Sequence, residues 1–237
     1  MIEAINLGKK FGEKWAIKDL NLKIARGEFF CFLGPNGAGK TTTIKIFTGL
    51  IKPTLGRIRI AGLNWHDNSI EIKKIIGYIP DTPFLYEELT LEEFLEFIIQ
   101  VYKLPPKQTH SKIEFLLERF RLKEYRDVLI KEFSHGLKQR VVYISNLIHN
   151  PLYLFIDEPL VGLDPYSIRV IKDILKELTT QGTTIFMSTH ILSIAQELAT
   201  SIGIVDKGRM IAQGRLEELL KIKGRTLEEV FFALTEE

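Results

Sequence analysis

The most constraining feature of the sequence is a glycine-rich stretch, Gly34-Pro35-Asn36-Gly37-Ala38-Gly39-Lys40-Thr41, which satisfies the pattern G-x-x-x-x-G-K-[ST]. It directly follows an apolar run, Phe29 to Leu33, and directly precedes a segment with helical spacing, Thr42 to Leu50. In a strand, loop and helix of this order, successive backbone amides point at phosphate oxygens and the helix adds its positive end. The stretch therefore predicts an α/β fold with a phosphate-binding loop.

The side chains at the end of this loop suit a nucleotide. Lys40 is long enough to reach the outer phosphates, and Thr41 offers a hydroxyl to Mg²⁺. An ordinary glycine-rich turn is the alternative, which the flanking strand and helix disfavour. The predicted nucleotide-binding residues of the loop are Gly34, Pro35, Asn36, Gly37, Ala38, Gly39, Lys40, Thr41 and Thr42.

Two adjacent carboxylates, Asp157 and Glu158, follow a second apolar run, Leu152 to Ile156. Open α/β sheets bind ligands at the carboxyl ends of their strands, so both side chains are expected near the phosphates. Asp157 is predicted to hold Mg²⁺, directly or through water, and Glu158 to accept a proton from the attacking water or to polarise it. The alternative is a strand end followed by a solvated turn, where carboxylates are common.

A histidine is expected at the same edge of the sheet. The helical segment Ile168 to Leu178 leads into another buried strand, Thr184 to Met187, and the order strand, helix, strand implies a right-handed parallel unit. This strand ends at Ser188-Thr189-His190, which places His190 where it can contact a terminal phosphate. A lone histidine is more often structural than catalytic, and that alternative stays open.

The rest of the pattern predicts a β region at the N-terminus, a helical region, and a return to strands. Helical spacing dominates from Thr90 to about Asn150, which we interpret as a helical subdomain at about 87–150. A tail at about 214–237 contains two short amphipathic helices. The other expected strands are Ile2 to Leu7, Ala16 to Ile24, Arg57 to Ala61, Ile75 to Ile79, Ile202 to Val205 and Met210 to Ala212.

Composition and charge narrow the class of protein. The 32 basic and 30 acidic residues give a net charge of +2, which does not support nonspecific clamping of nucleic acid. The single cysteine, Cys31, cannot form an internal disulfide and is expected to be a buried, inert thiol. No apolar segment approaches a membrane span and the start, Met1 to Ala4, lacks the pattern of a signal peptide, so we expect a chain that neither spans a membrane nor is exported.

A further motif, Phe133-Ser134-His135-Gly136-Leu137-Lys138-Gln139-Arg140, lies between the phosphate loop and the carboxylate pair. Together these motifs resemble the ATP-binding subunits of ABC transporters, and the resemblance covers nearly the whole chain, with this stretch as the LSGGQ-type signature. It implies that Ser134 and Gly136 contact a γ-phosphate held by the phosphate loop of a second subunit. Ser134 is also a suitable N-cap for the helix that follows, and the two roles are compatible.

The resemblance assigns further residues. Phe11 matches the aromatic residue that stacks on adenine, although an aromatic beside a strand usually belongs to the core. Val161-Gly162-Leu163-Asp164 resembles the D-loop that contacts the dimer partner, so Asp164 is expected at the nucleotide across the dimer. His190 matches the switch histidine. These assignments are what the resemblance implies.

The sequence departs from the family pattern in two places. Asp81 stands where the family usually has glutamine; a carboxylate can still coordinate magnesium, but it adds a charge and cannot donate a hydrogen bond while ionised. His135 and Leu137 replace the usual glycine and glutamine of the signature, which we interpret as variation within the exporter branch.

The resemblance implies a single ABC ATPase domain over residues 1–237: a P-loop NTPase core with a mostly parallel sheet, an antiparallel N-terminal β subdomain and a helical signature subdomain. It implies an ATPase that uses Mg²⁺, pairs with a second ATPase subunit, and drives transport through a separate membrane permease from the cytoplasmic face of the membrane. The tail segment Leu227 to Phe231 is similar to that of ABC-2-type exporters. The alternative is a soluble ABC ATPase that acts in translation or DNA repair.

The site of the membrane partner is expected near the helical region. Pro83-Phe84-Leu85-Tyr86 is the candidate apolar contact, and packing inside the helical subdomain is the alternative. No nucleic-acid partner is expected, and the transported substrate stays open.

Overall fold

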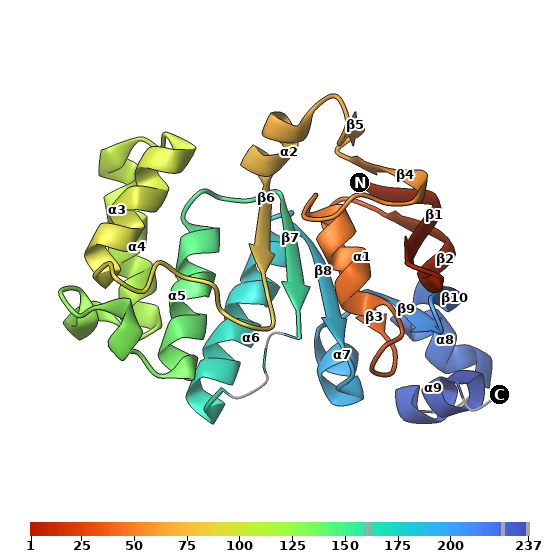
Figure 1. The fold of residues 1–237 in the computed structure, drawn as a ribbon. Coiled ribbons are helices and arrows are strands. Elements are labelled where there is room, and N and C mark those ends of the chain that lie inside the picture. Colours follow the sequence, from red (N-terminus) through yellow and green to blue (C-terminus); the bar gives the residue numbers. More distant parts are fainter. Residues whose placement is uncertain (159, 161–162, 224–225, 236–237) are drawn as a thin grey trace.

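Two β-sheets and the helices around them form the part of the chain that the computed structural model describes, residues 1–158, 160, 163–223 and 226–235 (Figure 1). The larger sheet has the strand order β10-β9-β3-β8-β7-β6, and every neighbouring pair is parallel except β9 with β10. The strands of this sheet are β3 (Phe29–Leu33), β6 (Ile76–Ile79), β7 (Tyr153–Asp157), β8 (Thr184–Thr189), β9 (Ser201–Asp206) and β10 (Arg209–Arg215). The expected mostly parallel core is confirmed.

The smaller sheet is antiparallel and has the order β2-β1-β4-β5. Gly12, with φ of 55°, lies in the turn between β1 and β2. The strands are β1 (Ile2–Phe11), β2 (Lys14–Ile24), β4 (Leu55–Ile60) and β5 (Leu63–Asn64).

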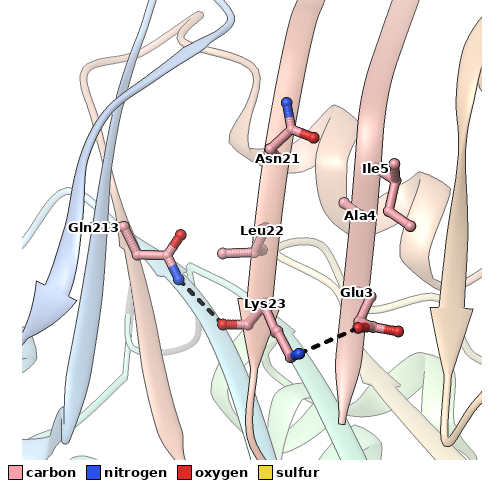
Figure 2. Close-up of a pocket in the computed structure, with 7 residues that line it drawn as sticks. All are labelled: Glu3, Ala4, Ile5, Asn21, Leu22, Lys23 and Gln213. Atoms are coloured by element: carbon pink, nitrogen blue, oxygen red, sulfur yellow. Dashed lines mark hydrogen bonds and ion pairs between the residues drawn. The ribbon is translucent and has the colours of Figure 1, made fainter.

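The two sheets meet where β2 lies beside β10. Figure 2 shows Gln213 of β10 reaching the backbone of β2, where its side-chain nitrogen donates to the carbonyl oxygen of Lys23 at 3.1 Å. On the same surface the ammonium of Lys23 lies 3.8 Å from Glu3 of β1. A shallow pocket of about 340 Å³ lies on this seam, and the charged side chains that line it form this ion pair.

Helices cover both faces of the larger sheet and extend beyond its β6 edge (Figure 1). Helix α3 begins with a capping box in which Thr90 and Glu93 satisfy each other's backbone amides, and its apolar stripe is buried. The helices are α1 (Lys40–Phe47), α2 (Ser69–Ile75), α3 (Leu91–Tyr102), α4 (Pro106–Arg119), α5 (His135–Leu147), α6 (Pro165–Thr180), α7 (Leu192–Leu198), α8 (Leu216–Lys223) and α9 (Leu227–Thr235). None of the described helices is long and apolar enough to cross a membrane.

The core lies on both sides of β3. Phe29, Cys31 and Leu33 belong to one cluster of buried apolar side chains, and the alternating Phe30 and Phe32 belong to the other. A strand covered on both faces is expected to be apolar throughout, which explains this run. Burial raises the pKa of the Cys31 thiol, consistent with the inert cysteine that the sequence predicts.

The elements differ from the predictions mainly at short helices and at boundaries. Helices α2 and α7 were not predicted, because helices of seven residues complete too few turns to show a clear apolar period. Helix α1 begins at Lys40, two residues before the run of helical spacing at Thr42, since the preceding Gly39 adopts a positive φ and ends the loop. The tail does contain two helices, α8 and α9.

Candidate nucleotide site

The glycine-rich loop connects β3 to α1, and its last lysine is held inside it. The Nζ of Lys40 donates to the carbonyl oxygens of Gly34 at 2.7 Å and of Pro35 at 3.2 Å. Gly39 has φ of 103°, and a Cβ there would lie only 2.5 Å from the carbonyl oxygen of Ala16. Only glycine fits that position, so the smaller sheet presses directly against the loop.

The tip of the phosphate loop is exposed to solvent. Residues 35–37 are exposed, while Thr41 and Thr42 lie half-buried in the first turn of α1. The exposed backbone amides of such a loop are the groups that bind phosphate oxygens.

Asp157 is the last residue of β7 and is fully buried. One carboxylate oxygen accepts a hydrogen bond from the hydroxyl of Ser188 on β8, whereas Oδ2 has no partner among the described residues. Burial raises the pKa of Asp157, whereas the hydrogen bond from Ser188 and the nearby hydroxyl of Thr41 lower it. A buried carboxylate oxygen without a partner is costly, so this atom fits a bound cation.

Glu158 follows Asp157 in the sequence, and its carboxylate contacts two other predicted site residues, Lys40 and His190. Its Oε1 lies 3.5 Å from the Nζ of Lys40, and its Oε2 lies 2.9 Å from the Nδ1 of His190. Its backbone has φ of 46°, which is strained for a residue with a side chain, and its amide donates to the carbonyl oxygen of Ser188 at 3.2 Å. Lys40, Glu158 and His190 therefore converge from the ends of three neighbouring strands.

The signature motif forms the start of α5. Ser134 is its N-cap and accepts a hydrogen bond from the amide of Leu137 at 3.3 Å, so the predicted capping role is confirmed. Gly136 has space around it, because among the described residues a Cβ there would meet Leu163 alone, at 3.8 Å. Strands β6, β7 and β8 separate α5 from the loop that precedes α1 (Figure 1). Within one chain, the signature motif therefore does not lie beside the phosphate loop.

Asp164 is engaged within its own chain. Its carboxylate caps α6 by accepting from the backbone amide of Ser167 at 3.0 Å, and Arg140 of α5 pairs with it at 2.6 Å. These hydrogen bonds, with Ser167 contributing most, hold the pKa of Asp164 well below its usual range. Val161 and Gly162 of the expected D-loop lie outside the described residues.

Asp81 and Phe11 lie on exposed parts of the molecule. Asp81 follows β6, and its carboxylate accepts from the amide of Thr82 at 2.8 Å. Its negative charge contributes to the raised pKa of Asp157, so the two carboxylates share one region. Phe11 ends β1 with 52% of its surface exposed, which removes the alternative of a core aromatic. The ammonium of Lys9 lies 4.9 Å from the centre of its ring.

Two residues at the site were not predicted from the sequence. Ser188 holds Asp157, and Gln139 of α5 donates to the carbonyl oxygen of Pro80, next to Asp81, at 3.4 Å. A serine after an apolar run carries no signal of its own, and a glutamine inside a helix carries none either. Their roles arise from contacts between elements distant in sequence.

Comparison with known proteins identifies the family. The family model described as ABC transporter matches residues 17–161. The chain belongs to the ABC transporter family. Its fold is that of the ABC ATPase cassette: it superimposes on the ATP-binding subunit of an ABC transporter with a TM-score of 0.94 and 34% identity, covering 99% of both chains. A dimeric ATP-binding cassette, MJ0796, bound to ADP and phosphate gives a TM-score of 0.82 at 28% identity, covering 91% of this chain and 99% of that one.

Relatives of this ABC transporter family member are named for transport or for drug resistance. The bacitracin transport ATP-binding protein BcrA of Bacillus licheniformis is 36% identical over 96% of this chain and 74% of its own length. The daunorubicin resistance ATP-binding protein DrrA3 of Streptomyces coeruleorubidus is 36% identical over 89% of this chain and 67% of its own.

One longer relative is the probable multidrug ABC transporter ATP-binding protein YbhF of Escherichia coli, which is 37% identical over 92% of this chain. The chain spans only 38% of the length of YbhF. These relatives favour a transporter ATPase over the alternative of a soluble ABC ATPase that acts in translation or DNA repair.

Proposed function

We propose that the chain binds and hydrolyses ATP to drive export of a substrate through a separate integral membrane subunit. The observation that carries the proposal is the convergence of Lys40 and His190 on Glu158, at 3.5 Å and 2.9 Å. Export rather than import is supported by relatives named for bacitracin transport, daunorubicin resistance and multidrug transport. The substrate is selected by the membrane subunit in this proposal.

The residues of the site suit phosphoryl transfer to water. Lys40 and the exposed loop amides are positioned to bind the outer phosphates, and the side chain of Glu158 can orient a water and accept its proton. In this structure Lys40 is bound by two loop carbonyls and by Glu158. A phosphate entering the loop would replace these contacts, freeing the carboxylate of Glu158 for water. His190 is placed to contact the transferred group.

The acidic part of the site fits Mg²⁺, which we propose as the cofactor. Asp157 has a buried oxygen without a partner among the residues that the structure describes, and Thr41 lies close enough to affect its pKa. Carboxylate and hydroxyl oxygens are the ligands that Mg²⁺ prefers, and the ion supplies charge neutralisation of the phosphates. Asp81 adds a third oxygen donor in the same region, where it also adds negative charge.

We propose that a second ATPase subunit completes the nucleotide site, and the placement of α5 supports this proposal. Ser134 and Gly136 lie at the exposed start of this helix, whose amides and dipole favour an anion, but the phosphate loop of the same chain is separated from it by three strands. We propose that α5 faces the nucleotide of a partner subunit. Asp164 is proposed to face the same nucleotide, and in this structure it pairs with Arg140.

The membrane partner is proposed to dock on the segment before α3. Phe84 is 88% exposed, whereas Tyr86 packs on Phe97 of α3 with ring centroids 5.2 Å apart. The neighbouring Glu87 and Glu88 are paired with lysines at 2.6 Å and 2.9 Å, so they serve the fold of this segment. Phe84 is more exposed than Tyr86, so we propose it as the main contact, and docking there would place the chain at the membrane surface.

Co-purification from solubilised membranes tests this assignment. The tagged chain should recover a membrane protein with several spanning helices in near-stoichiometric amount, and Phe84→Ala should lower that yield by about tenfold while ATP hydrolysis by the isolated chain is unchanged. Phe115→Ala is the matched control, since Phe115 is 56% exposed on α4, outside this segment. Absence of a membrane partner, or equal loss with both variants, would contradict the proposal.

A further inference from the structure

A second cavity lies at the far end of α1 from the phosphate loop. It has a volume of about 780 Å³, within the range of sites that hold small organic ligands. Residues from the end of α1, from β4 and β5, and from α2 line it. Its cationic lining residues are Lys52, Arg57, Arg59 and Lys73, and its apolar ones include Ile46, Ile51, Pro53, Ile58 and Trp65.

The cations of this cavity have no carboxylate partner in the part of the chain that the structure describes. None of the four forms an ion pair with any described residue, and the one acidic lining residue, Asp67, pairs instead with His66 at 2.9 Å. The seam pocket of Figure 2 differs, because its lysine and glutamate pair with each other. In a chain with a net charge of only +2, four unpaired cations around one cavity produce a local positive potential.

Part of the lining is fixed before any ligand arrives. The indole nitrogen of Trp65 donates to the carbonyl oxygen of Phe47 at 2.9 Å. A Cβ on Gly49 would lie 2.7 to 2.9 Å from three atoms of the Trp65 ring, so the ring rests against this glycine. The Nε of Arg59 is likewise held by Asn64, at 3.2 Å. A ligand that meets such a wall does not have to order it, which favours binding.

This cavity is distinct from the nucleotide site. Helix α1 separates the two, because Lys40 begins it and Gly49 lies just beyond its end. The lining of the cavity contains none of the residues of the phosphate loop, the carboxylate pair or the signature motif.

We propose that this cavity binds an organic phosphate, whose charged group is held by Arg57, Arg59 and the two lysines while an apolar, ring-sized body lies against Trp65 and Ile51. Arginine is suited to this because its planar group donates two parallel hydrogen bonds to a phosphate. Inorganic phosphate would contact only the cationic side chains, and a purely apolar ligand would contact only the apolar ones. An organic phosphate can contact both.

Trp65 supplies the reporter for the test. The chain has two tryptophans, so Trp15→Phe leaves Trp65 as the only indole, and adding Lys40→Ala weakens the nucleotide site. Titration of this double variant with AMP should change Trp65 fluorescence saturably. Adenosine and inorganic phosphate, each carrying half of the proposed ligand, should bind at least about tenfold more weakly.

Matched arginine variants complete the experiment. Arg57→Gln with Arg59→Gln should weaken AMP binding by about tenfold or more. Arg209→Gln with Arg215→Gln, which changes two exposed arginines of β10, should leave it unchanged, and circular dichroism should show all variants folded. No saturable change with AMP, equal affinity for phosphate alone, or binding only to phosphatidylglycerol vesicles would overturn the proposal.

Discussion

At the scale of single residues, the candidate site combines groups that the sequence reveals with groups that it does not. Lys40, Asp157 and Glu158 were predicted because phosphate and metal chemistry requires those residue types directly after apolar strands. The bond from Ser188 to Asp157 was not predicted, because it joins two strands that are neighbours only in the folded sheet. The ion pair between Arg140 and Asp164 was not predicted either, because Arg140 lies in α5 and Asp164 caps α6.

Ser188 is expected to orient Asp157. Ser188→Ala removes the hydroxyl that fixes one carboxylate oxygen, which leaves a second buried oxygen without a hydrogen bond. Loss of a hydrogen bond to a charged group changes an equilibrium constant by about one or two factors of ten. The Mg²⁺ concentration for half-maximal ATP hydrolysis should therefore rise about tenfold.

The control for this prediction is Ser145→Ala, a serine on α5 whose hydroxyl bonds to the backbone of its own helix. ATP binding measured without Mg²⁺ should be unchanged by Ser188→Ala. An unaltered Mg²⁺ dependence would show that Ser188 does not orient the carboxylate.

At the scale of elements, long periodic segments were predicted well and short ones poorly. Helices α3 and α6 have buried stripes that recur with helical spacing, whereas α2 and α7 are too short to show one. How the helices attach to the sheet could not be predicted. His149, just beyond α5, stacks on Tyr102 of α3 at 4.1 Å and its Nε2 donates to the carbonyl oxygen of Ile76 at 2.9 Å.

We expect the contacts of His149 with Tyr102 and Ile76 to weaken at acidic pH. Burial lowers the pKa of His149, and the charge of Lys112 lowers it further, although the bond to Ile76 opposes the shift. Below the ordinary histidine pKa of 6.5 the unfolded chain therefore binds a proton that the folded chain does not. The contribution of neutral His149 to the free energy of unfolding should be fully present above that pH and should decrease as the pH drops below it.

Urea unfolding at pH 7.5 and at lower pH measures this effect. The loss of stability on acidification should be smaller in His149→Gln, which cannot titrate but keeps an N–H donor. His66→Gln is the control, because the side chain of His66 is 96% exposed. Equal acid sensitivity in His149→Gln and the parent chain would contradict the assignment.

At the scale of the whole molecule, the parallel order of β3, β8 and β7 brings the ends of all three strands to one edge. This arrangement follows from the strand, helix, strand order of the sequence, so the convergence of Lys40, Glu158 and His190 could be anticipated. The distance of α5 from that edge could not, because it depends on how the helices pack beyond β6. That separation supports the proposal that two subunits enclose the nucleotide.

The most direct test is the behaviour of Glu158→Gln with ATP. The variant keeps Lys40, the loop and the signature helix but cannot accept a proton from water. It should bind ATP, lose at least about a hundredfold in turnover, and form a stable dimer on ATP addition in analytical ultracentrifugation. Hydrolysis at the parental rate, or a monomer at saturating ATP, would contradict the central claim that Glu158 activates water at a nucleotide shared by two subunits.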